Sequence, residues 1–289
     1  RMKTDKPKPL VSLADHQLVQ YPLNTAKALK PERRVLVTSY KKGEVKKYVL
    51  ENNTGDFIFC EQKERLGTGH AVKQAAPYLP DTGKTLVLYA DVPLITAASL
   101  NKLIKSALRK KISILTSKIT KPKGYGRIIR DEKMNPTNIR EEADASAQEK
   151  TINEIFTGIM IADNEFLKNG LKGLVRNNKA GEYYLTDLVE YASKRKLPIG
   201  STEAKELEVF GANNKKELEG LYSAMVALNI DTAKRKGTFF KDTSTCYVEG
   251  DLKVGKDVSI GNNVTIKGNV VLGNDVSIGS NVILSNTKI

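Results

Sequence analysis

The sequence predicts an α/β domain with a mostly parallel sheet, followed by a parallel β-helix. Strand-like and helix-like segments alternate through the first part of the 289-residue chain, which is typical of a parallel sheet covered by helices. Near the C-terminus, apolar residues recur every six positions, which is typical of hexapeptide repeats. A third observation is the apolar segment 85–94, in which a carboxylate, Asp91, follows a predicted strand.

The predicted elements follow from local patterns of apolar residues. Short apolar runs of the kind that a sheet buries predict strands at residues 34–40, 57–60, 85–91, 112–119 and 152–162. Helical spacing of apolar residues predicts helices at residues 45–50, 71–79, from Thr96 onward, within 181–194 after a cap at Thr186, and at 218–228.

Two apolar registers with a period of six form the C-terminal repeat. They consist of Val254, Ile260, Ile266, Leu272, Ile278 and Leu284, and of Val258, Val264, Val270, Val276 and Val282. In such a repeat the branched residues point inward, and Gly or Asn turns the corners. Stacked repeats need neighbours or caps, so we expect the natural protein to continue beyond Ile289, or a partner chain to cover the open flank.

Asp91 lies where open α/β sheets bind ligands, at the carboxyl end of a buried strand. Pro93 cannot donate a hydrogen bond to a sheet, so we expect the strand to stop near Asp91. The alternative is that Asp91 only caps the following turn, and its position alone does not separate the two interpretations.

Composition narrows the class of protein. No run approaches the ~18 apolar residues that cross a bilayer, so we expect no membrane insertion. Two distant cysteines, Cys60 and Cys246, fit a reducing compartment such as the cytoplasm. The net charge of +14 first suggests a nucleic-acid partner. Because the basic residues are scattered, we favour a Lys-rich surface or a phosphorylated small substrate, with no nucleic acid bound.

Two further motifs could carry chemistry. The Gly-rich turn 66–71 leads into a helix, where backbone amides can bind phosphate or the edge of a base, although a tight strand–helix connection explains it too. His70 within this turn is interpreted as a packing or capping residue. Lys8 lies between two prolines on a stiff, extended backbone, which suits a cation facing a phosphate, and a solvated basic loop is the alternative.

Taken in order, these segments resemble one enzyme family, the bacterial bifunctional N-acetylglucosamine-1-phosphate uridyltransferase/glucosamine-1-phosphate acetyltransferases. The resemblance covers essentially the whole chain and is carried by the segments RM…D-x-PK-x-L, EQ…LGTGHA, LYADVPL, GYGRI, EEADA, TGI, GEYYLTD and GANN, followed by the hexapeptide repeats. It implies a Rossmann-like nucleotidyltransferase domain at 1–214, a linker helix at 215–236, and the start of a left-handed β-helix at 237–289 that forms a homotrimer.

The resemblance also implies a reaction. UTP and N-acetylglucosamine 1-phosphate give UDP-N-acetylglucosamine and pyrophosphate, with Mg²⁺ as cofactor, in the synthesis of cell-envelope precursors such as peptidoglycan and lipopolysaccharide. The sugar phosphate is itself the nucleophile, so catalysis is mainly alignment and neutralisation of charge. This agrees with the lack of a convincing nucleophile–base pair in the sequence.

By similarity, each site residue has an implied role. Asp91 and Asn213 match the metal ligands, and a carboxylate with an amide suits Mg²⁺. Arg1 and Lys8 match the residues that contact phosphate. The positions that match uracil recognition are Gln62, Gly67 and Thr68. Those in the nucleotide-contacting strand are Tyr89 and Ala90. Those that match the sugar site are Gly126, Glu141, Tyr184 and Thr186.

Three departures from the family pattern leave alternatives open. The chain begins at the Arg of the family signature, so we expect the first strand and the Gly-rich phosphate loop to be missing. Phe156 and Phe210 replace polar residues near the sugar side, and a phenyl ring cannot make an amide's hydrogen bonds, so another sugar 1-phosphate is the second candidate substrate. The β-helix covers about two coils, so we expect no acetyltransferase activity. An inactive oligomerising fragment is the third interpretation.

Overall fold

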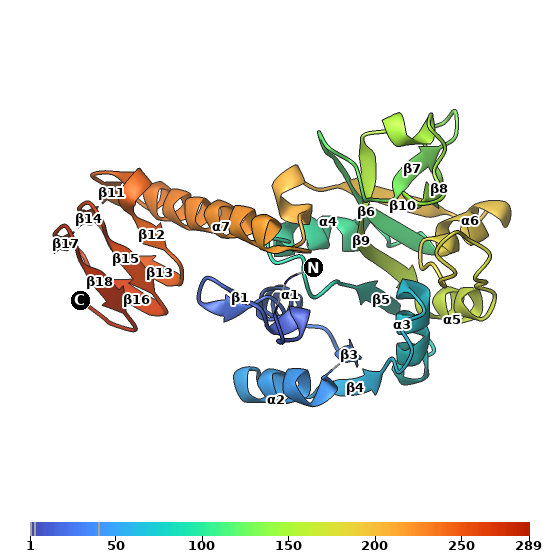
Figure 1. The fold of residues 1–289 in the computed structure, drawn as a ribbon, viewed down its shortest axis with the longest axis horizontal. Coiled ribbons are helices and arrows are strands. Elements are labelled where there is room, and N and C mark those ends of the chain that lie inside the picture. Colours follow the sequence, from blue (N-terminus) through green and yellow to red (C-terminus); the bar gives the residue numbers. More distant parts are fainter. Residues whose placement is uncertain (1, 3, 40) are drawn as a thin grey trace. The chain divides into compact units, whose positions relative to one another are not determined.

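The computed structural model describes residues 2, 4–39 and 41–289, and these form two compact units (Figure 1). One unit is Val19–Phe210, and the other joins Arg1–Leu18 to Gly211–Ile289. The two ends of the chain therefore belong to the same unit. The domain limits expected from the family, 1–214, 215–236 and 237–289, remain predictions.

The larger unit is built on a six-stranded sheet. Its order is β10 (Ile199–Glu203), β6 (Ile112–Lys118), β9 (Glu154–Asp163), β7 (Arg127–Arg130) and β8 (Pro136–Arg140), with β5 (Lys84–Val87) also paired to β9. Strand β10 is parallel to β6, and β9 is antiparallel to both β5 and β6. Strands β5, β6 and β10 thus share one direction, as a mostly parallel sheet requires, and β9 runs against them. Strands β3 (Val35–Thr38) and β4 (Ile58–Glu61) form a separate parallel pair.

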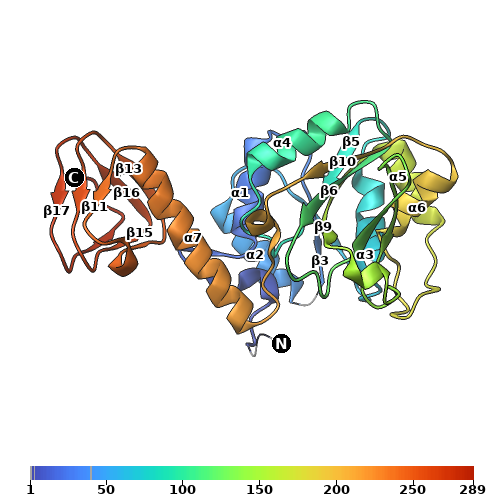
Figure 2. The same cartoon turned by 90° about the horizontal axis from the view of Figure 1, so that it is seen from above.

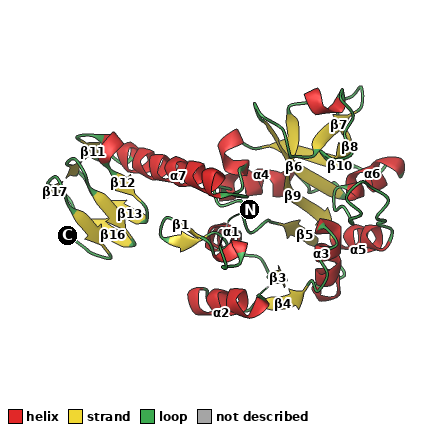
Figure 3. Ribbon diagram, viewed as in Figure 1, coloured by secondary structure: helices red, strands yellow, loops and turns green. Residues whose placement is uncertain are grey.

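Helices pack on both faces of this sheet, as the alternating pattern predicts (Figure 3). Helices α3 (Thr68–Ala75), α5 (Asn164–Lys172) and α6 (Asp187–Lys194) bury their apolar residues with Ile114 of β6. Helix α4 (Ala97–Ser106) buries Leu100 and Leu103 with Leu115, the next residue of β6. Successive strand residues therefore supply two separate cores. The unit also contains α1 (Gln20–Ala28) and α2 (Lys42–Asn52).

The predicted elements are present, with ends that shift by a few residues. Thr96 caps α4 as predicted, since its side chain accepts a hydrogen bond from Ser99 N at 3.2 Å. The strand expected to reach Asp91 ends at Val87, where its pairing with β9 stops opposite Met160. The strand expected at 34–40 covers 35–38, and Tyr40 lies outside the described residues.

The smaller unit contains the long helix α7 (Lys215–Arg235) and the β-helix (Figure 2). Asn214 caps α7 by accepting a hydrogen bond from Glu217 N at 2.9 Å. Three parallel stacks follow: β11 (Phe239–Phe240), β14 (Ser259–Ile260) and β17 (Ser277–Ile278); β12 (Tyr247–Val248), β15 (Thr265–Lys267) and β18 (Ile283–Ser285); and β13 (Asp251–Val254) with β16 (Asn269–Leu272).

The parallel β-helix predicted from the period of six is confirmed. Tyr247 pairs with Thr265, and Thr265 with Ile283, so one coil takes 18 residues. Ile260 and Ile266 of the first register and Val264 of the second are at most 1% exposed. Corners are turned by residues of positive φ such as Asn263 and Asn281, a conformation that Asn tolerates better than most residues. The handedness of the β-helix remains a prediction.

A short N-terminal hairpin completes the smaller unit. Strands β1 (Ser12–Leu13) and β2 (His16–Gln17) pair antiparallel, and the Asp15 carboxylate between them accepts a hydrogen bond from Gly268 N of the β-helix. No helix among the described residues has the length and apolar character that crossing a membrane requires.

Candidate active site

The Gly-rich turn and the GEYYLTD segment form the centre of the site, because their backbones bind each other. Tyr183 N donates to Leu66 O at 2.8 Å, and Gly69 N donates to Tyr183 O at 2.8 Å. Leu185 N donates to the Thr68 hydroxyl at 3.2 Å. Two segments more than one hundred residues apart are thereby held as one surface at the start of α3.

Gly67 makes this close approach possible. Its φ is +99°, in the region that favours glycine, and a Cβ there would lie 2.7 Å from Tyr183 O. The Gln62 side chain closes the same turn, since its Nε2 donates to Gly67 O at 3.0 Å. The structure therefore brings Gln62, Gly67 and Thr68 together, as the base-recognising role expected for them requires.

Tyr89 connects this turn to the sheet. Its hydroxyl is hydrogen-bonded to the Thr68 side chain. Its ring packs on Gly158 of β9, where an added Cβ would lie 2.6 Å from a ring carbon of Tyr89. Burial, then the nearby Glu141 carboxylate, raises the pKa of Tyr89 well above its usual value. Asp91 adds to this shift, so its carboxylate also lies near the Tyr89 ring. Tyr89 therefore remains a neutral hydroxyl.

Glu141 and Thr186 form a hydrogen-bonded pair beside Tyr89. The Thr186 hydroxyl donates to Glu141 Oε1 at 2.9 Å, and Thr186 is only 2% exposed. Thr186 occupies the N-cap position of α6, as predicted, but its side chain does not cap the helix because the hydroxyl is used by Glu141. A Cβ on Gly126 would lie 3.5 Å from Glu141 Oε2. Three of the residues expected at the sugar thus meet.

Burial raises the pKa of Glu141, and the carboxylates of Asp187, Asp144 and Glu182 add to the effect, whereas the Thr186 hydrogen bond opposes it. Tyr184 has a raised pKa from burial and from the Asp144 carboxylate. This end of the site is therefore rich in hydrogen-bond acceptors. Hydroxyl groups, such as those of a sugar, are the complementary donors.

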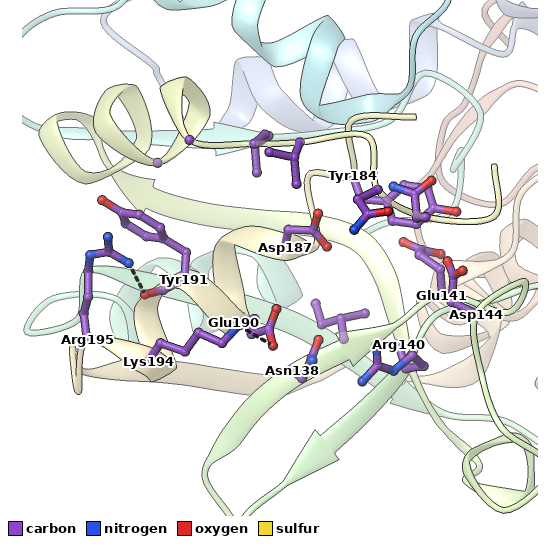
Figure 4. Close-up of a pocket in the computed structure, with 17 residues that line it drawn as sticks. Asn138, Arg140, Glu141, Asp144, Tyr184, Asp187, Glu190, Tyr191, Lys194 and Arg195 are labelled. Carbon is purple, nitrogen blue, oxygen red and sulfur yellow. Dashed lines mark hydrogen bonds and ion pairs between the residues drawn. The ribbon is translucent and has the colours of Figure 1, made fainter. Parts of the chain in front are cut away.

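A cavity of about 540 Å³ opens beside this group (Figure 4). Glu141, Asp144 and Tyr184 lie at one end of it, and Tyr191 and Arg195 lie at the other. Gln62, Thr68, Tyr89 and Thr186 do not line it. The cavity therefore extends away from the Gly-rich turn, beyond the sugar-side residues.

Lys8 and Asn213 lie in the smaller unit and contact each other. Lys8 Nζ donates to Asn213 Oδ1 at 2.8 Å, and Asn213 N donates to Glu217 Oε2 at 2.7 Å. The expectation that Lys8 sits on an extended backbone is wrong, because Lys8–Leu10 form a 3₁₀ turn closed by Leu10 N donating to Pro7 O at 2.8 Å. Pro9 fits this turn because its missing N–H is not needed in the first turn.

The expected metal ligands belong to different units, Asp91 to the larger and Asn213 to the smaller. Both supply oxygen, the donor that Mg²⁺ prefers. Among the described residues, no three or more His, Cys, Asp or Glu side chains are grouped to hold a metal. A donor set of one carboxylate and one amide fits a magnesium that completes its shell with water and substrate phosphate. Arg1 lies outside the described residues.

Some residues of this surface carry no signal that sequence reasoning recognised. Tyr183 hydrogen-bonds to the Gly-rich turn through its backbone, so its side-chain identity gives no indication of these hydrogen bonds. Gly158, with a φ of +87°, makes room for the Tyr89 ring; a glycine inside a strand run was the available signal. His70 contacts two glutamine side chains, Gln62 and Gln74, rather than only packing.

Comparisons with known proteins agree with this fold. Residues 1–149 match the family described as MobA-like NTP transferase domain, and residues 247–286 match the bacterial transferase hexapeptide family. The bifunctional protein GlmU of Idiomarina loihiensis is 38% identical over 264 residues, which is 91% of this chain and 57% of that protein. GlmU of Nitrosomonas europaea is 42% identical over 265 residues, with 91% and 57% covered. The chain thus spans somewhat more than half the length of these relatives.

Solved structures show the same fold at low identity. The inositol-1-phosphate CTP transferase from T. maritima has a TM-score of 0.61 and 18% identity, over 77% of this chain and 87% of that one. HddC from Yersinia pseudotuberculosis has a TM-score of 0.57 and 17% identity, over 77% and 91%. Because residues 1–149 and 247–286 match these two families and the fold agrees with both, the chain belongs to the MobA-like NTP transferase family and carries bacterial transferase hexapeptide repeats.

Proposed function

We propose that the protein transfers a uridylyl group from UTP to N-acetylglucosamine 1-phosphate, releasing UDP-N-acetylglucosamine and pyrophosphate. The observation that carries this proposal is the joined surface of the Gly-rich turn and the GEYYLTD segment, with Tyr89 and the Glu141–Thr186 pair beside it. Its residues are those that the resemblance implies for the base and the sugar. The similarity to GlmU proteins supports the same assignment.

Each part of the surface has a role in this reaction. Gln62, Gly67 and Thr68 hold the base, and Tyr89 and Ala90 lie along the nucleotide. Gly126, Glu141, Tyr184 and Thr186 accept and position the sugar. Binding the sugar phosphate in line with the α-phosphate of UTP removes the entropy cost of bringing the two substrates together. This alignment supplies much of the rate acceleration.

Asp91 and Asn213 would hold Mg²⁺, which neutralises negative charge on the phosphates. Lys8, with Arg1, would contribute a further positive charge at the phosphates. Because Lys8 Nζ donates to Asn213 Oδ1, the lysine already stands beside an expected metal ligand. Binding of a phosphate would draw the ammonium from the amide, since the phosphate oxygen carries a negative charge and the amide oxygen is neutral.

A second candidate substrate is another sugar 1-phosphate. Phe156 is 5% exposed in the core of the larger unit, and its backbone N donates to the carbonyl oxygen of Gly126, a residue expected at the sugar. Its ring offers no hydrogen bond to a substrate. Turnover compared across a panel of sugar 1-phosphates separates the two candidates.

The proposal also includes a homotrimer formed through the β-helix and a place in the cytoplasm, where precursors of the cell envelope are made. The third candidate, an oligomerising fragment without activity, predicts that the protein sediments as a trimer but binds neither UTP nor UDP-N-acetylglucosamine in calorimetry.

Radioactive pyrophosphate exchange with UDP-N-acetylglucosamine and Mg²⁺ tests the proposed reaction in the protein as its gene encodes it. We expect exchange in the native protein and a loss of about 100-fold or more in Asp91→Ala, since the metal and the charges around the phosphates carry the chemistry. Asp56→Ala, an exposed aspartate, is the matched control. Exchange that survives Asp91→Ala removes the metal role, and its absence from the native protein removes the proposed reaction.

A further inference from the structure

The amide of Gln62 has a fixed orientation, because one of its neighbours can only accept. Its terminal atom lies 3.0 Å from the carbonyl oxygen of Gly67, so that atom must be the nitrogen. The same nitrogen lies 3.2 Å from Nδ1 of His70. Both hydrogens of the amide therefore point at protein acceptors, provided that Nδ1 carries no proton.

An amide nitrogen also faces the other side of the His70 ring. Nε2 of His70 lies 3.1 Å from Nε2 of Gln74, which also donates to the His70 carbonyl oxygen at 3.3 Å. A neutral imidazole accepts at only one nitrogen. The Gln62 amide is anchored by the shorter bond to Gly67, so Nδ1 is the acceptor. Nε2 then carries the proton. The Gln74 atom that faces it is the amide nitrogen, so this amide must turn over to present its oxygen as the acceptor, and it gives up the 3.3 Å contact with the His70 carbonyl oxygen.

The ring itself is held in place by an aromatic neighbour. His70 stacks on Tyr183, with ring centroids 6.0 Å apart and planes inclined by 24°. Tyr183 is the residue whose backbone binds the Gly-rich turn on both sides of Gly67. The Gly-rich turn, Tyr183 and the His70 ring thus form one rigid group around Gln62.

The consequence concerns the remaining atom of Gln62. With its nitrogen used by Gly67 and His70, only the oxygen Oε1 remains to meet a ligand, and it has no hydrogen-bond partner among the described residues. An oxygen accepts and cannot donate. A base that presents an N–H there is bound, and a base that presents a ring nitrogen lone pair is rejected.

We propose that His70 is a positioning residue that locks Gln62 as an acceptor and so makes the site select uracil over cytosine. This rests on the proposed function, in which Gln62 faces the base. Uracil carries a proton on N3, and cytosine carries a lone pair there. A buried group left without its partner gives strong discrimination, which a packing contact alone does not.

Two variants of His70 separate positioning from packing. His70→Phe keeps a ring on Tyr183 but removes the acceptor for the Gln62 amide. We expect the ratio of kcat/KM for UTP over CTP to fall about tenfold, because one hydrogen bond then no longer discriminates between the bases. His70→Asn offers an oxygen near the place of Nδ1, and we expect it to restore most of the ratio. His16→Phe, in the smaller unit, changes the other histidine of the chain and should leave the ratio unchanged.

The outcomes divide cleanly. A ratio that stays at the native value in His70→Phe, or falls without recovery in His70→Asn, overturns the proposal, as does a fall in kcat alone. A native protein that turns over neither nucleotide removes the proposed function instead. In that case ¹⁵N NMR of the native protein at neutral pH still tests the lock: we expect the His70 tautomer protonated at Nε2, and protonation at Nδ1 overturns it.

Discussion

Partly buried carboxylates set the character of the candidate site at the scale of single residues. Glu141 and Asp187 come from β8's end and from the start of α6, and burial is the largest cause that raises the pKa of each. For Asp187 the pKa rises to about 6, with Glu190 and Asp144 adding to the effect. Such groups reduce the stability of the fold when they are ionised, which the protein tolerates at a site that needs acceptors.

This shift makes a prediction for Asp187→Asn. The folded pKa of Asp187, about 6, exceeds its ordinary value of 3.8, so between these pH values the native state binds more protons than the unfolded state. Stability from this group is therefore greatest in acid and is lost as pH rises through about 6. We expect the variant to gain stability relative to the native protein from pH 4 to pH 7, by on the order of 1 kcal/mol.

Urea unfolding of both proteins across that range measures the effect. The exposed Asp56→Asn is the control, and its stability should follow the native profile. Parallel profiles for the native protein and Asp187→Asn would show that burial does not set the protonation of this carboxyl.

The sequence predicted individual site residues better than the contacts between them. Gln62, Gly67 and Thr68 are neighbours in the chain, so their meeting needed only a turn. Glu141 and Thr186 meet because β8 and α6 pack together, which no local pattern reveals. The Thr186 hydroxyl could cap its own helix or bind Glu141, and only the tertiary partner decides between them.

At the scale of elements, glycine positions in the β-helix depend on what the next coil places above them. Gly250 lies against Gly268, the residue one coil later, and a Cβ there would meet Gly268 N at 2.5 Å and collide with the Asp15 carboxylate. Gly220, within helix α7, has no atom within 4 Å of its Cβ position. Both glycines belong to the smaller unit, and residue identity alone does not distinguish them.

We therefore expect Gly250→Ala to destabilise the protein by on the order of 2 kcal/mol, because backbone of the adjacent coil and the N-terminal hairpin must move. Gly220→Ala should cause no loss of stability, because Ala favours a helix over Gly by about 1 kcal/mol. Thermal unfolding of the two variants measures the difference. Equal losses would mean that the close contact between coils is relieved without cost.

The helices and strands were predictable where the residues of the element itself determine its position. Thr96 and Asn214 cap the starts of α4 and α7 through their own side chains, and the period of six fixes the 18-residue coil. Strand β5 is shorter than its apolar run because pairing with β9 ends it. Near that point Gly158 adopts a positive φ and the Tyr89 ring fills the space, a tertiary event that apolarity cannot predict.

At the scale of the whole molecule, the β-helix presents an exposed apolar column on one of its faces. Tyr247, Thr265 and Ile283 are paired one above another, and Tyr247 and Ile283 are 43% and 73% exposed. Exposed apolar residues in a line are typical of contact with another chain. A repeated unit related by closed symmetry would cover three such columns together, as the proposed trimer requires.

Ile283→Asp tests whether this column holds the trimer. A carboxylate placed in an apolar contact must be desolvated without a partner, so we expect the variant to sediment mainly as a monomer at about 10 µM where the native protein is a trimer. Ser277→Asp is the matched control, since Ser277 is exposed in the β11–β14–β17 stack rather than in the column's own stack, and it should leave the trimer intact. If both variants dissociate, or if Ile283→Asp stays trimeric, a different face of the β-helix forms the contact. A trimer that depends on Ile283 would also explain why so apolar a side chain is exposed within a single chain.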